Sequence, residues 1–459
     1  MKIALLYPYI KRHFPGCNPP ISLLYLAASL KRAGEKLIVI DADNGDLTTH
    51  DIVKRVFDYS PDLVGIPLFS TYLPAAHKLV TMLDAGSRRW KILLGGPHAT
   101  ARPREVLETF AGCDYVLRGE CERSIVGLAR HLEGRMDISE IEGLSYRKNG
   151  RTAHNPDEPL NMDLDSIDFP AREFLADAYR DRVYWRIGHR GATDVIITSR
   201  GCPYNCHFCF KISKKFRVRS PENILAELVE IRSLGTRNVH IMDDLFVWNK
   251  QNCLKTLAMI KRHKLRMNFK VRARTDLIDE ELLVAMRDAG VKSVVYGIES
   301  GSQELLDRMN KRTTVEMNRR AIELTKKVGM QCYADLFIGF PGETPATIRE
   351  TEKLITETKP TAVNCSVMYP LPDTKVYNDA RANGTLMGDW DAEGTRPWIK
   401  LPWIENVSTL WAYRDNLLRK YISNPIVILN AARYWLFNID FRQFIALVRY
   451  VYRFASSKA

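Results

Sequence analysis

Short apolar runs with the composition of β-strands alternate with helix-patterned stretches over residues 194–369. The stretch 220–235 carries its own boundary signals: Ser220 can cap a helix, Pro221 suits its first turn and Gly235 ends it. Strands and helices that alternate at this spacing predict a parallel sheet with the helices outside it. The six predicted strands are 194–199, 238–243, 268–273, 292–299, 332–340 and 362–369.

The first 145 residues repeat the strand and helix alternation in a second unit. Five apolar runs, at 2–9, 36–41, 62–70, 91–99 and 114–120, are separated by helical stretches such as 22–34. This pattern fits a flavodoxin-like, doubly wound sheet that binds its ligand at the carboxyl ends of the strands. No G-x-G-x-x-G follows the first run, which disfavours a dinucleotide-binding domain.

The remaining segments are a linker and a C-terminal region. Residues 146–190 are polar and interrupted by prolines, and we predict a linker there. We therefore expect four parts: 1–145, the linker 146–190, the second α/β unit 191–385, and a helical segment 386–459.

The C-terminal segment is basic, with eight Lys or Arg and two Asp after Trp411. At about 100° per residue, Arg442, Arg449 and Arg453 share one helix face. Aromatic and aliphatic side chains occupy the opposite face. This pattern suits an anionic membrane surface, or a helix packed on the second unit with a solvated basic stripe.

The sequence "RGCPYNCHFCF" (200–210) places Cys202, Cys206 and Cys209 in a C-x3-C-x2-C pattern. Nine cysteines at irregular positions do not form a disulfide framework. A structural zinc site normally takes four ligands, and no second cysteine pair follows. The spacing favours a [4Fe–4S] cluster in which three thiolates hold three irons and the fourth iron stays open.

Composition and the absence of certain sequence patterns limit the cellular compartment and the kinds of partner that we expect for this protein. The chain is 46% hydrophobic and 26% charged, as in ordinary globular proteins. We find no signal-peptide pattern and no apolar run of the roughly 20 residues that span a bilayer, so we expect a cytoplasmic protein, with the inner membrane face as a peripheral site. The net charge of +13 suits an acidic partner such as nucleic acid, anionic lipid or a phosphorylated ligand, or a basic solvated surface.

The C-x3-C-x2-C pattern with Phe208 before its last cysteine resembles the radical S-adenosylmethionine (SAM) superfamily. The resemblance implies a partial (β/α)6 TIM-type barrel, with SAM chelating the open iron and Phe208 near its adenine. It also implies an electron donor such as flavodoxin or ferredoxin. Cys202, Cys206 and Cys209 would be the metal ligands and the catalytic residues.

Several polar residues follow the predicted strands, where barrel enzymes place their active sites. In this family the acidic pair after the second strand would hold the amino group of SAM, although one of the two could cap the next helix instead. Arg272 and Arg274 suit a carboxylate or phosphate by the fork geometry of the guanidinium group. The residues to which we assign cofactor contacts are Asp243, Asp244, Arg274, Glu299 and Ser300.

The N-terminal unit resembles the cobalamin-binding domain that precedes many radical SAM cores. Small residues and turns would line its corrinoid pocket because backbone must approach the ligand closely. The motif D-x-H-x-x-G is absent, His13 is expected on the surface and His98 at a helix start, so we expect cobalamin without a protein histidine below cobalt. The predicted pocket residues are Ser70, Thr71, Gly95, Gly96 and Pro97.

These resemblances predict a cobalamin-dependent radical SAM enzyme with a small-molecule substrate. The favoured reaction is methylation of an unactivated carbon or a phosphinate phosphorus. In that reaction the deoxyadenosyl radical abstracts hydrogen and methylcobalamin delivers methyl. Oxidative cyclisation or rearrangement, as in the anaerobic magnesium-protoporphyrin ester cyclase, is the alternative. A tRNA-modifying enzyme and a non-catalytic iron–sulfur or corrinoid sensor are further alternatives, and the sequence contains no appended RNA-binding motif.

Overall fold

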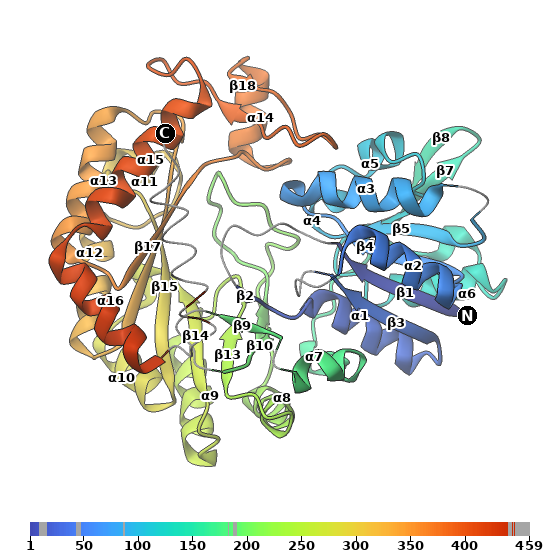
Figure 1. The fold of residues 1–459 in the computed structure, drawn as a ribbon, viewed down its shortest axis with the longest axis horizontal. Helices are drawn as coiled ribbons and strands as arrows, with labels where there is room; N and C mark the ends of the chain where they lie inside the picture. The colour runs from blue at the N-terminus through green and yellow to red at the C-terminus, as the bar shows by residue number, and fades with distance from the viewer. Residues whose placement is uncertain are drawn as a thin grey trace.

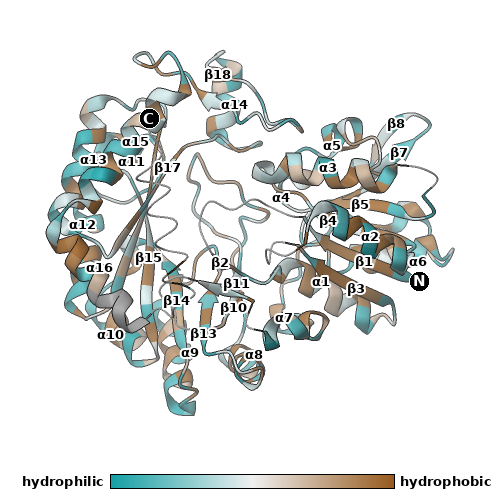
Figure 2. Ribbon diagram, viewed as in Figure 1, coloured by the Kyte–Doolittle hydropathy of each residue, from teal (hydrophilic) through white to brown (hydrophobic). Residues whose placement is uncertain are grey.

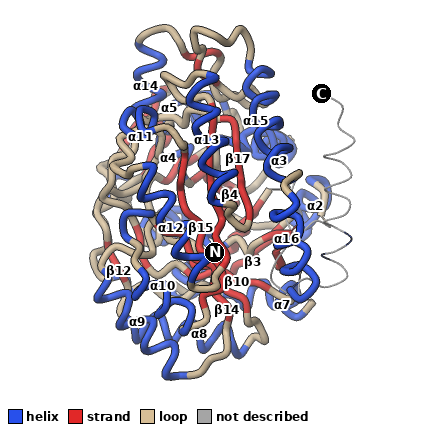
Figure 3. The backbone as a smooth tube through the Cα atoms, turned by 90° about the vertical axis from the view of Figure 1, so that its left-hand side faces the viewer, coloured by secondary structure: helices blue, strands red, loops and turns tan. Residues whose placement is uncertain are grey.

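The computed structural model describes residues 1–8, 16–42, 47–85, 88–181, 183–186 and 191–438, together with 443 and 445. Two α/β units lie beside each other, the N-terminal one on the right of Figure 1 and the second on the left. After a quarter turn, helices again flank the strands (Figure 3). His13, Arg442, Arg449 and Arg453 lie outside the described residues.

The N-terminal unit is built on a seven-stranded sheet of order β3-β1-β4-β5-β6-β7-β8. The first five strands of this order are parallel. That order is the flavodoxin-like one, with its switch point between β1 and β4. The strands are β1 (Lys2–Tyr7), β3 (Lys36–Asp41), β4 (Leu63–Pro67), β5 (Lys91–Gly95), β6 (Tyr115–Leu117), β7 (Leu144–Lys148) and β8 (Arg151–His154).

Helices cover both faces of this sheet because alternate strand residues point to opposite sides. Ile3 and Leu5 of β1 join the apolar cluster with α1 and α6, whereas Ala4 and Leu6 join the cluster with α2 and α3. The strands are accordingly mostly hydrophobic (Figure 2). The helices are α1 (Ile21–Arg32), α2 (Thr49–Tyr59), α3 (Leu73–Asp84), α4 (Pro97–Ala101), α5 (Pro103–Thr109) and α6 (Ser124–Leu132).

The antiparallel hairpin β7–β8 is a difference from the sequence prediction, which began the linker at residue 146. Asn149 and Gly150 connect the two strands with φ values of 50° and 75°, as a tight Asn-Gly hairpin turn requires. Tyr146 pairs with Tyr115 of β6. The hairpin therefore extends the N-terminal sheet, and its polar side chains concealed this from a composition-based reading.

The second unit contains the six predicted strands in one parallel sheet of order β10-β13-β14-β15-β16-β17. In the described residues β10 and β17 are its two edges, so the barrel is partial. The strands are β10 (Thr193–Ile196), β13 (Asn238–Ile241), β14 (Asn268–Ala273), β15 (Val291–Glu299), β16 (Gln331–Ile338) and β17 (Ala362–Val367).

The helices of this unit lie outside the sheet (Figure 1). The predicted start of α8 is confirmed, because the Ser220 hydroxyl accepts a hydrogen bond of 3.1 Å from the Asn223 amide. Asp279 caps α10 in the same way. The helices are α8 (Pro221–Ser233), α9 (Lys250–His263), α10 (Glu280–Asp288), α11 (Gln303–Arg308), α12 (Val315–Lys327), α13 (Pro345–Thr358) and α14 (Lys375–Ala382).

The linker docks on the second unit through Arg172 and on the N-terminal unit through Ala171. The Arg172 guanidinium is 1% exposed and donates to Asp194 of β10 at 2.8 Å and to Glu227 of α8 at 2.7 Å. Next to it, the Ala171 amide donates to the Leu24 carbonyl of α1 at 3.0 Å. Removing one member of such a buried charge group costs roughly 3–5 kcal/mol. The linker also contains α7 (Ala176–Arg180) and β9 (Trp185–Arg186), which pairs with β2 (Gly16–Cys17).

The C-terminal segment packs on the barrel through α15 (Val407–Ile422), and α16 (Pro425–Asn438) follows it. Arg414 of α15 donates to the Cys365 carbonyl of β17 at 2.9 Å. Tyr421 donates to the Pro360 carbonyl. α15 is thus packed on the second unit, whereas the predicted basic face with Arg442, Arg449 and Arg453 lies outside the described residues. Among the described residues, no helix is both long and apolar enough to cross a membrane.

Candidate active site between the two units

The three clustered cysteines lie in the loop between β11 (Ser199–Arg200) and β12 (Arg217–Val218). Cys202 and Cys206 are half-buried and Cys209 is exposed. All nine cysteines are free thiols, and the other six are buried. The loop therefore presents the accessible thiols of this chain together in one place.

The turn after α11 holds the middle of this loop. The His207 amide donates to the Met309 carbonyl at 2.9 Å, and its ring Nδ1 lies 2.8 Å from the Arg308 carbonyl. The Asn310 side chain donates to the Asn205 carbonyl at 2.7 Å. These bonds give His207 a structural role within the cysteine triplet.

Gly201 sets the start of the loop. Its φ is +82°, and a Cβ there would lie 2.4 Å from the Lys215 carbonyl oxygen. A residue with a side chain would be strained at this φ and would collide with backbone. Glycine therefore lets the two ends of the loop pass close together, where the Cys202 amide donates to the Ser213 carbonyl at 3.3 Å.

The donor set fits a cluster that spreads its thiolates over separate irons. In the described part of the chain, no three His, Cys, Asp or Glu side chains are grouped to hold a single metal ion. A [4Fe–4S] cluster does not require such a group, because each of the three cysteines binds a different iron.

Phe208 and Glu299 both lie beside Lys311. The Lys311 Nζ is 2.7 Å from the Glu299 carboxylate and 5.9 Å from the centre of the Phe208 ring. Phe208 also packs edge-on against Phe337 of β16, with ring centres 4.8 Å apart. The fold thus brings these two predicted cofactor residues together and neutralises the charge of Glu299 locally.

The two neighbouring acids after β13 differ in their surroundings. Asp243 is 2% exposed and accepts hydrogen bonds from the Thr198 amide at 2.6 Å, from the Thr198 hydroxyl and from the Ser199 hydroxyl at 2.7 Å. Burial raises the pKa of Asp243 to about 6. Asp244 instead lines the cavity between the units. Asp243 therefore joins two strand ends, and Asp244 is the member of the pair that faces ligand space.

Arg274 and Ser300 are both engaged with protein groups. The Arg274 guanidinium donates to Asp276 at 2.9 Å and to the Lys311 carbonyl at 2.7 Å, and it lies 3.6 Å from the centre of the Tyr204 ring. Ser300 is 1% exposed, and its Oγ accepts from the Ser302 amide at 3.1 Å. Arg274 therefore supports the cysteine loop through Tyr204, and Ser300 shapes the turn after β15.

A cavity of about 410 Å³ lies between the carboxyl ends of the two sheets. Its N-terminal wall includes the predicted residues Gly95, Gly96 and Pro97, and its other wall includes Gly201 and Asp244. Other lining residues come from β1, α1, β4, β5, β6 and the cysteine loop: Leu5, Leu23, Leu26, Gly65, Leu93, Leu117, Glu120, Arg200, Ile212 and Ser213.

On the N-terminal wall of the cavity, the backbone is exposed where glycines lack side chains. A Cβ on Gly95 would meet only the Leu117 carbonyl oxygen, at 3.6 Å, and Gly65 lies on the neighbouring strand β4. With the leucines around them, these positions form an apolar surface that a large flat ligand can approach closely. This wall fits a corrinoid and its nucleotide base.

Ser70 and Thr71 do not line that cavity. Ser70 is buried and its Oγ lies 2.9 Å from Nδ1 of His98, whereas Thr71 is exposed. Burial lowers the pKa of His98 to about 4, so its imidazole is neutral near pH 7. The pair of Ser70 and His98 lies below the cavity wall rather than in it, and the prediction that both Ser70 and Thr71 contact the corrinoid has no support from their placement.

Ion pairs connect the N-terminal unit to the two residues that flank the cysteine loop. Arg200, directly before Gly201, donates to Glu120 at 2.9 Å and to Glu122 at 2.5 Å. Arg217 of β12 donates to the same Glu120 at 3.0 Å. Burial raises the pKa of Glu120, but the hydrogen bond from Arg217 and the charge of Arg200 outweigh it, so the net pKa is lowered.

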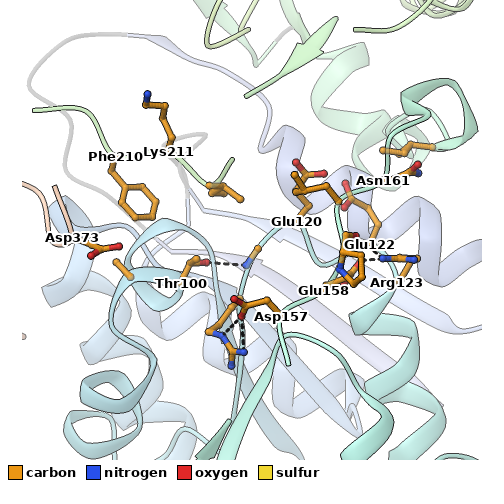
Figure 4. Close-up of a pocket in the computed structure, with 17 residues that line it drawn as sticks. Thr100, Glu120, Glu122, Arg123, Asp157, Glu158, Asn161, Phe210, Lys211 and Asp373 are labelled. Carbon is orange, nitrogen blue, oxygen red and sulfur yellow. Dashed lines mark hydrogen bonds and ion pairs between the residues drawn. The ribbon is translucent and has the colours of Figure 1, made fainter. Parts of the chain in front are cut away.

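A second cavity of about 330 Å³ adjoins the first and shares Gly119, Glu120, Glu122 and Ile212 with it. Figure 4 shows Phe210 and Lys211 of the cysteine loop on one side of it and Arg123 and Glu158 on another. The linker thus closes one side of the space beside the cysteine loop.

Two family models match these two units. The radical SAM superfamily matches residues 196–355, and the B12 binding domain matches residues 9–129. An uncharacterised methyltransferase of Pyrococcus horikoshii is 31% identical over 93% of this chain and 92% of its own length. The chain belongs to the cobalamin-binding branch of the radical SAM superfamily. It is an enzyme, and its cofactors are a [4Fe–4S] cluster, SAM and cobalamin.

Other relatives differ in the chemistry that their names state. An anaerobic magnesium-protoporphyrin IX monomethyl ester cyclase of Rubrivivax gelatinosus is 28% identical over 83% of this chain and 70% of its own. A cytidylyl-2-hydroxyethylphosphonate methyltransferase of Streptomyces wedmorensis is 27% identical over 74% of this chain and 73% of its own. The structure of the radical SAM methyltransferase TsrM from Kitasatospora setae shares the fold, with a TM-score of 0.74 at 19% identity, covering 93% of this chain and 89% of that one.

The sequence analysis missed the residues that join the two units. From the local sequence alone, these residues are expected to be solvated charges beside turns; they are Glu120, Glu122, Arg200 and Arg217. Their only local signal is position, because Glu120 follows a predicted strand and Arg200 precedes the cysteine triplet. Their pairing depends on how the two sheets face each other.

Proposed function

We propose that this enzyme methylates an unactivated carbon, or a phosphinate phosphorus, of a small molecule. When bound, SAM at the cluster supplies the radical that removes a hydrogen atom, and cobalamin supplies the methyl group. The observation that carries the proposal is the cavity between the units, which has the glycine wall on one side and the start of the cysteine loop on the other. A substrate there would lie between both cofactors.

We assign the residues as follows. Cys202, Cys206 and Cys209 hold the cluster. Phe208 contacts the adenine of SAM, and Asp244 accepts from its amino group. The backbone at Gly95, Gly96 and Pro97 borders the corrinoid. For the domains we retain the boundaries of the sequence prediction, except that the cobalamin-binding unit extends to residue 154 to include β8.

The test is the product ratio with reductant, SAM and substrate. A methylase of this type uses two SAM molecules per turnover, one to remethylate cobalamin and one to form the radical. S-adenosylhomocysteine and 5′-deoxyadenosine should therefore accumulate in about equal amounts. Chromatography of both products over time measures the ratio. A ratio far from one that persists with every accepted substrate contradicts methylation.

The cyclase relative supports a second candidate, an oxidative cyclisation or rearrangement without methyl transfer. The same assay separates it from methylation, because 5′-deoxyadenosine would then rise without S-adenosylhomocysteine. Measuring the mass of the product gives an independent check, since methylation adds one CH2 unit to the substrate whereas oxidative cyclisation and rearrangement do not.

We also propose two partners. A small acidic electron donor such as flavodoxin or ferredoxin would dock beside Cys209, where Lys214 and Lys215 are exposed. Peripheral contact of a cytoplasmic enzyme with an anionic membrane would use the basic C-terminal segment that carries Arg442, Arg449 and Arg453. In α16, which precedes it, Ile426, Ile428 and Leu429 are at least half exposed. Co-sedimentation with phosphatidylglycerol vesicles tests the membrane contact. Recovery of the whole protein in the supernatant would rule it out.

A further inference from the structure

The inner face of the barrel sheet carries a row of polar side chains near the carboxyl ends of its strands. On β16, Cys332, Ala334 and Leu336 are buried against the outer helices. Asp335 points to the opposite face, where Gly297 of β15 pairs beside it. On its other side it pairs with the exposed Asn364 of β17. Inner positions on three adjacent strands are therefore a glycine, a carboxylate and an amide.

Arg272 of β14 completes this row from the far side of Gly297. Its guanidinium Nη1 is 3.8 Å from the Asp335 Oδ2, a distance at the outer limit of an ion pair. The space over Gly297 is taken by the Glu299 carboxylate and the Lys311 ammonium group, which a Cβ there would meet. The Asn364 side chain donates to Asp335 at 3.3 Å.

Arg272, near the end of β14, and Arg274, directly after it, differ in how many protein groups bind their guanidinium groups. Arg274 is 7% exposed in its side chain and is fixed by Asp276, a carbonyl and the Tyr204 ring. The Arg272 side chain is 50% exposed and has the long contact with Asp335. Most of the planar donor fork of Arg272 is thus free to meet a ligand.

The row also lies close to the cofactor site. Burial raises the pKa of Asp244, and the charge of Arg272 opposes that rise. Asp244 itself lines the cavity between the units. Arg272 therefore lies near the acid that we assign to SAM, outside the residues that line the cavity.

We propose that Arg272, Asp335 and Asn364 form a substrate-recognition site for an anionic small molecule. The guanidinium fork of Arg272 takes its carboxylate or phosphoryl group, and Asp335 with Asn364 takes a hydroxyl or amino group. This inference rests on the proposed function, whose substrate it assigns to a polar, negatively charged class. It excludes an uncharged lipid as the substrate.

The experiment uses holoenzyme with cluster, cobalamin and SAM bound, without reductant, and titrates it calorimetrically with inorganic phosphate, acetate and glycerol. We expect saturable binding of phosphate or acetate with a dissociation constant of about 1–20 mM, and no binding of glycerol. Arg272→Gln should weaken this binding about tenfold or more, and Arg272→Lys should restore part of it as a point charge. Asp335→Asn should strengthen it, because a competing carboxylate is removed.

Arg320→Gln is the matched control, since it removes the same charge from an exposed position on the outer helix α12. It should leave anion binding unchanged. Phosphate binding alone would assign a phosphoryl substrate, and acetate binding alone a carboxylate. Absence of saturable anion binding, or equal binding by Arg272→Gln, overturns the proposal.

SAM cleavage by the reduced enzyme without substrate distinguishes a role of Arg272 in substrate recognition from a role in SAM binding. Arg272→Gln should keep this background production of 5′-deoxyadenosine, and its loss would show that Arg272 serves SAM instead. If anion binding depends on Arg272 but no methyl group is transferred with any substrate, the recognition site stands and the proposed methylation falls.

Discussion

The two walls of the cavity between the units differ in how they are made. The N-terminal wall is backbone and aliphatic surface, with Gly65 and Gly95 on adjacent strands. The barrel wall is a polar loop whose histidine and preceding arginine are held by bonds to other segments. A corrinoid is recognised by the space that absent side chains leave, whereas the cluster is recognised by ligand atoms. Substitutions on the two walls should therefore separate the two cofactors.

Removing a cluster ligand should have the largest effect. Cys206→Ala should reduce iron from about four per chain to near zero and lower SAM cleavage by about a thousandfold, because a [4Fe–4S] cluster is held by its thiolates. Iron analysis and 5′-deoxyadenosine production measure this. The control is Cys253→Ala, at a buried cysteine in α9, which should keep its iron. Full iron content in Cys206→Ala would remove the cluster assignment.

Filling the opposite wall should act on cobalamin alone. In Gly95→Val the new Cβ meets only one carbonyl oxygen at 3.6 Å, so the chain should still fold. The branched side chain then enters the cavity, and we expect cobalamin affinity to fall about tenfold or more. Equilibrium dialysis monitored by corrinoid absorption measures it, with iron content as the internal control. Unchanged cobalamin binding would place the corrinoid elsewhere.

Breaking the contact between the walls should lower the stability of the fold rather than the affinity for one cofactor. Arg200→Gln leaves Glu120 and Glu122 without their shared cation, and we expect roughly 3–5 kcal/mol of destabilisation. Chemical unfolding measures the free energy. Adding Glu122→Gln to the variant should recover part of the loss, because Arg200 is the ion-pair partner of Glu122, and strictly additive effects would mean that the pair is not coupled.

A pH dependence should distinguish the two neighbouring acids. The folded pKa of Asp243 is raised from 3.8 to about 6 by burial. Because it exceeds the unfolded value, the stability that Asp243 contributes is complete below pH 3.8 and is lost as pH rises to about 6, by about 3 kcal/mol in total. Asp243→Asn should lack this fall.

The measurement for Asp243 is the unfolding free energy of wild type and variant at intervals from pH 4 to 7. Other carboxylates titrate in both proteins, so the difference between the two curves isolates Asp243. Parallel curves would show that this carboxyl is not buried in a protonated form. Asp244→Asn is the matched comparison and should change SAM binding more than stability.

Much of the fold could be predicted because its signals are local. The six barrel strands, the caps at Ser220 and Asp279 and the stop at Gly235 are each written within a few residues. The hairpin β7–β8 was missed although Asn149-Gly150 is a strong turn signal, since the flanking residues are polar. Its strands are held by pairing with β6, which is not visible from composition.

The candidate site divides in the same way. By itself, the sequence determined the three thiolates, their glycine and the identity of the two cofactor units, because spacing along one loop and strand periodicity are short-range properties. Only the tertiary structure decided the roles of three pairs. Asp244 faces the cavity while Asp243 joins two strands. Protein groups bind the guanidinium of Arg274, whereas the side chain of Arg272 is half exposed, and Arg200 reaches Glu120. Those outcomes depend on distances between residues that lie 37 to 80 positions apart in the chain, which burial and pairing set after the chain has folded.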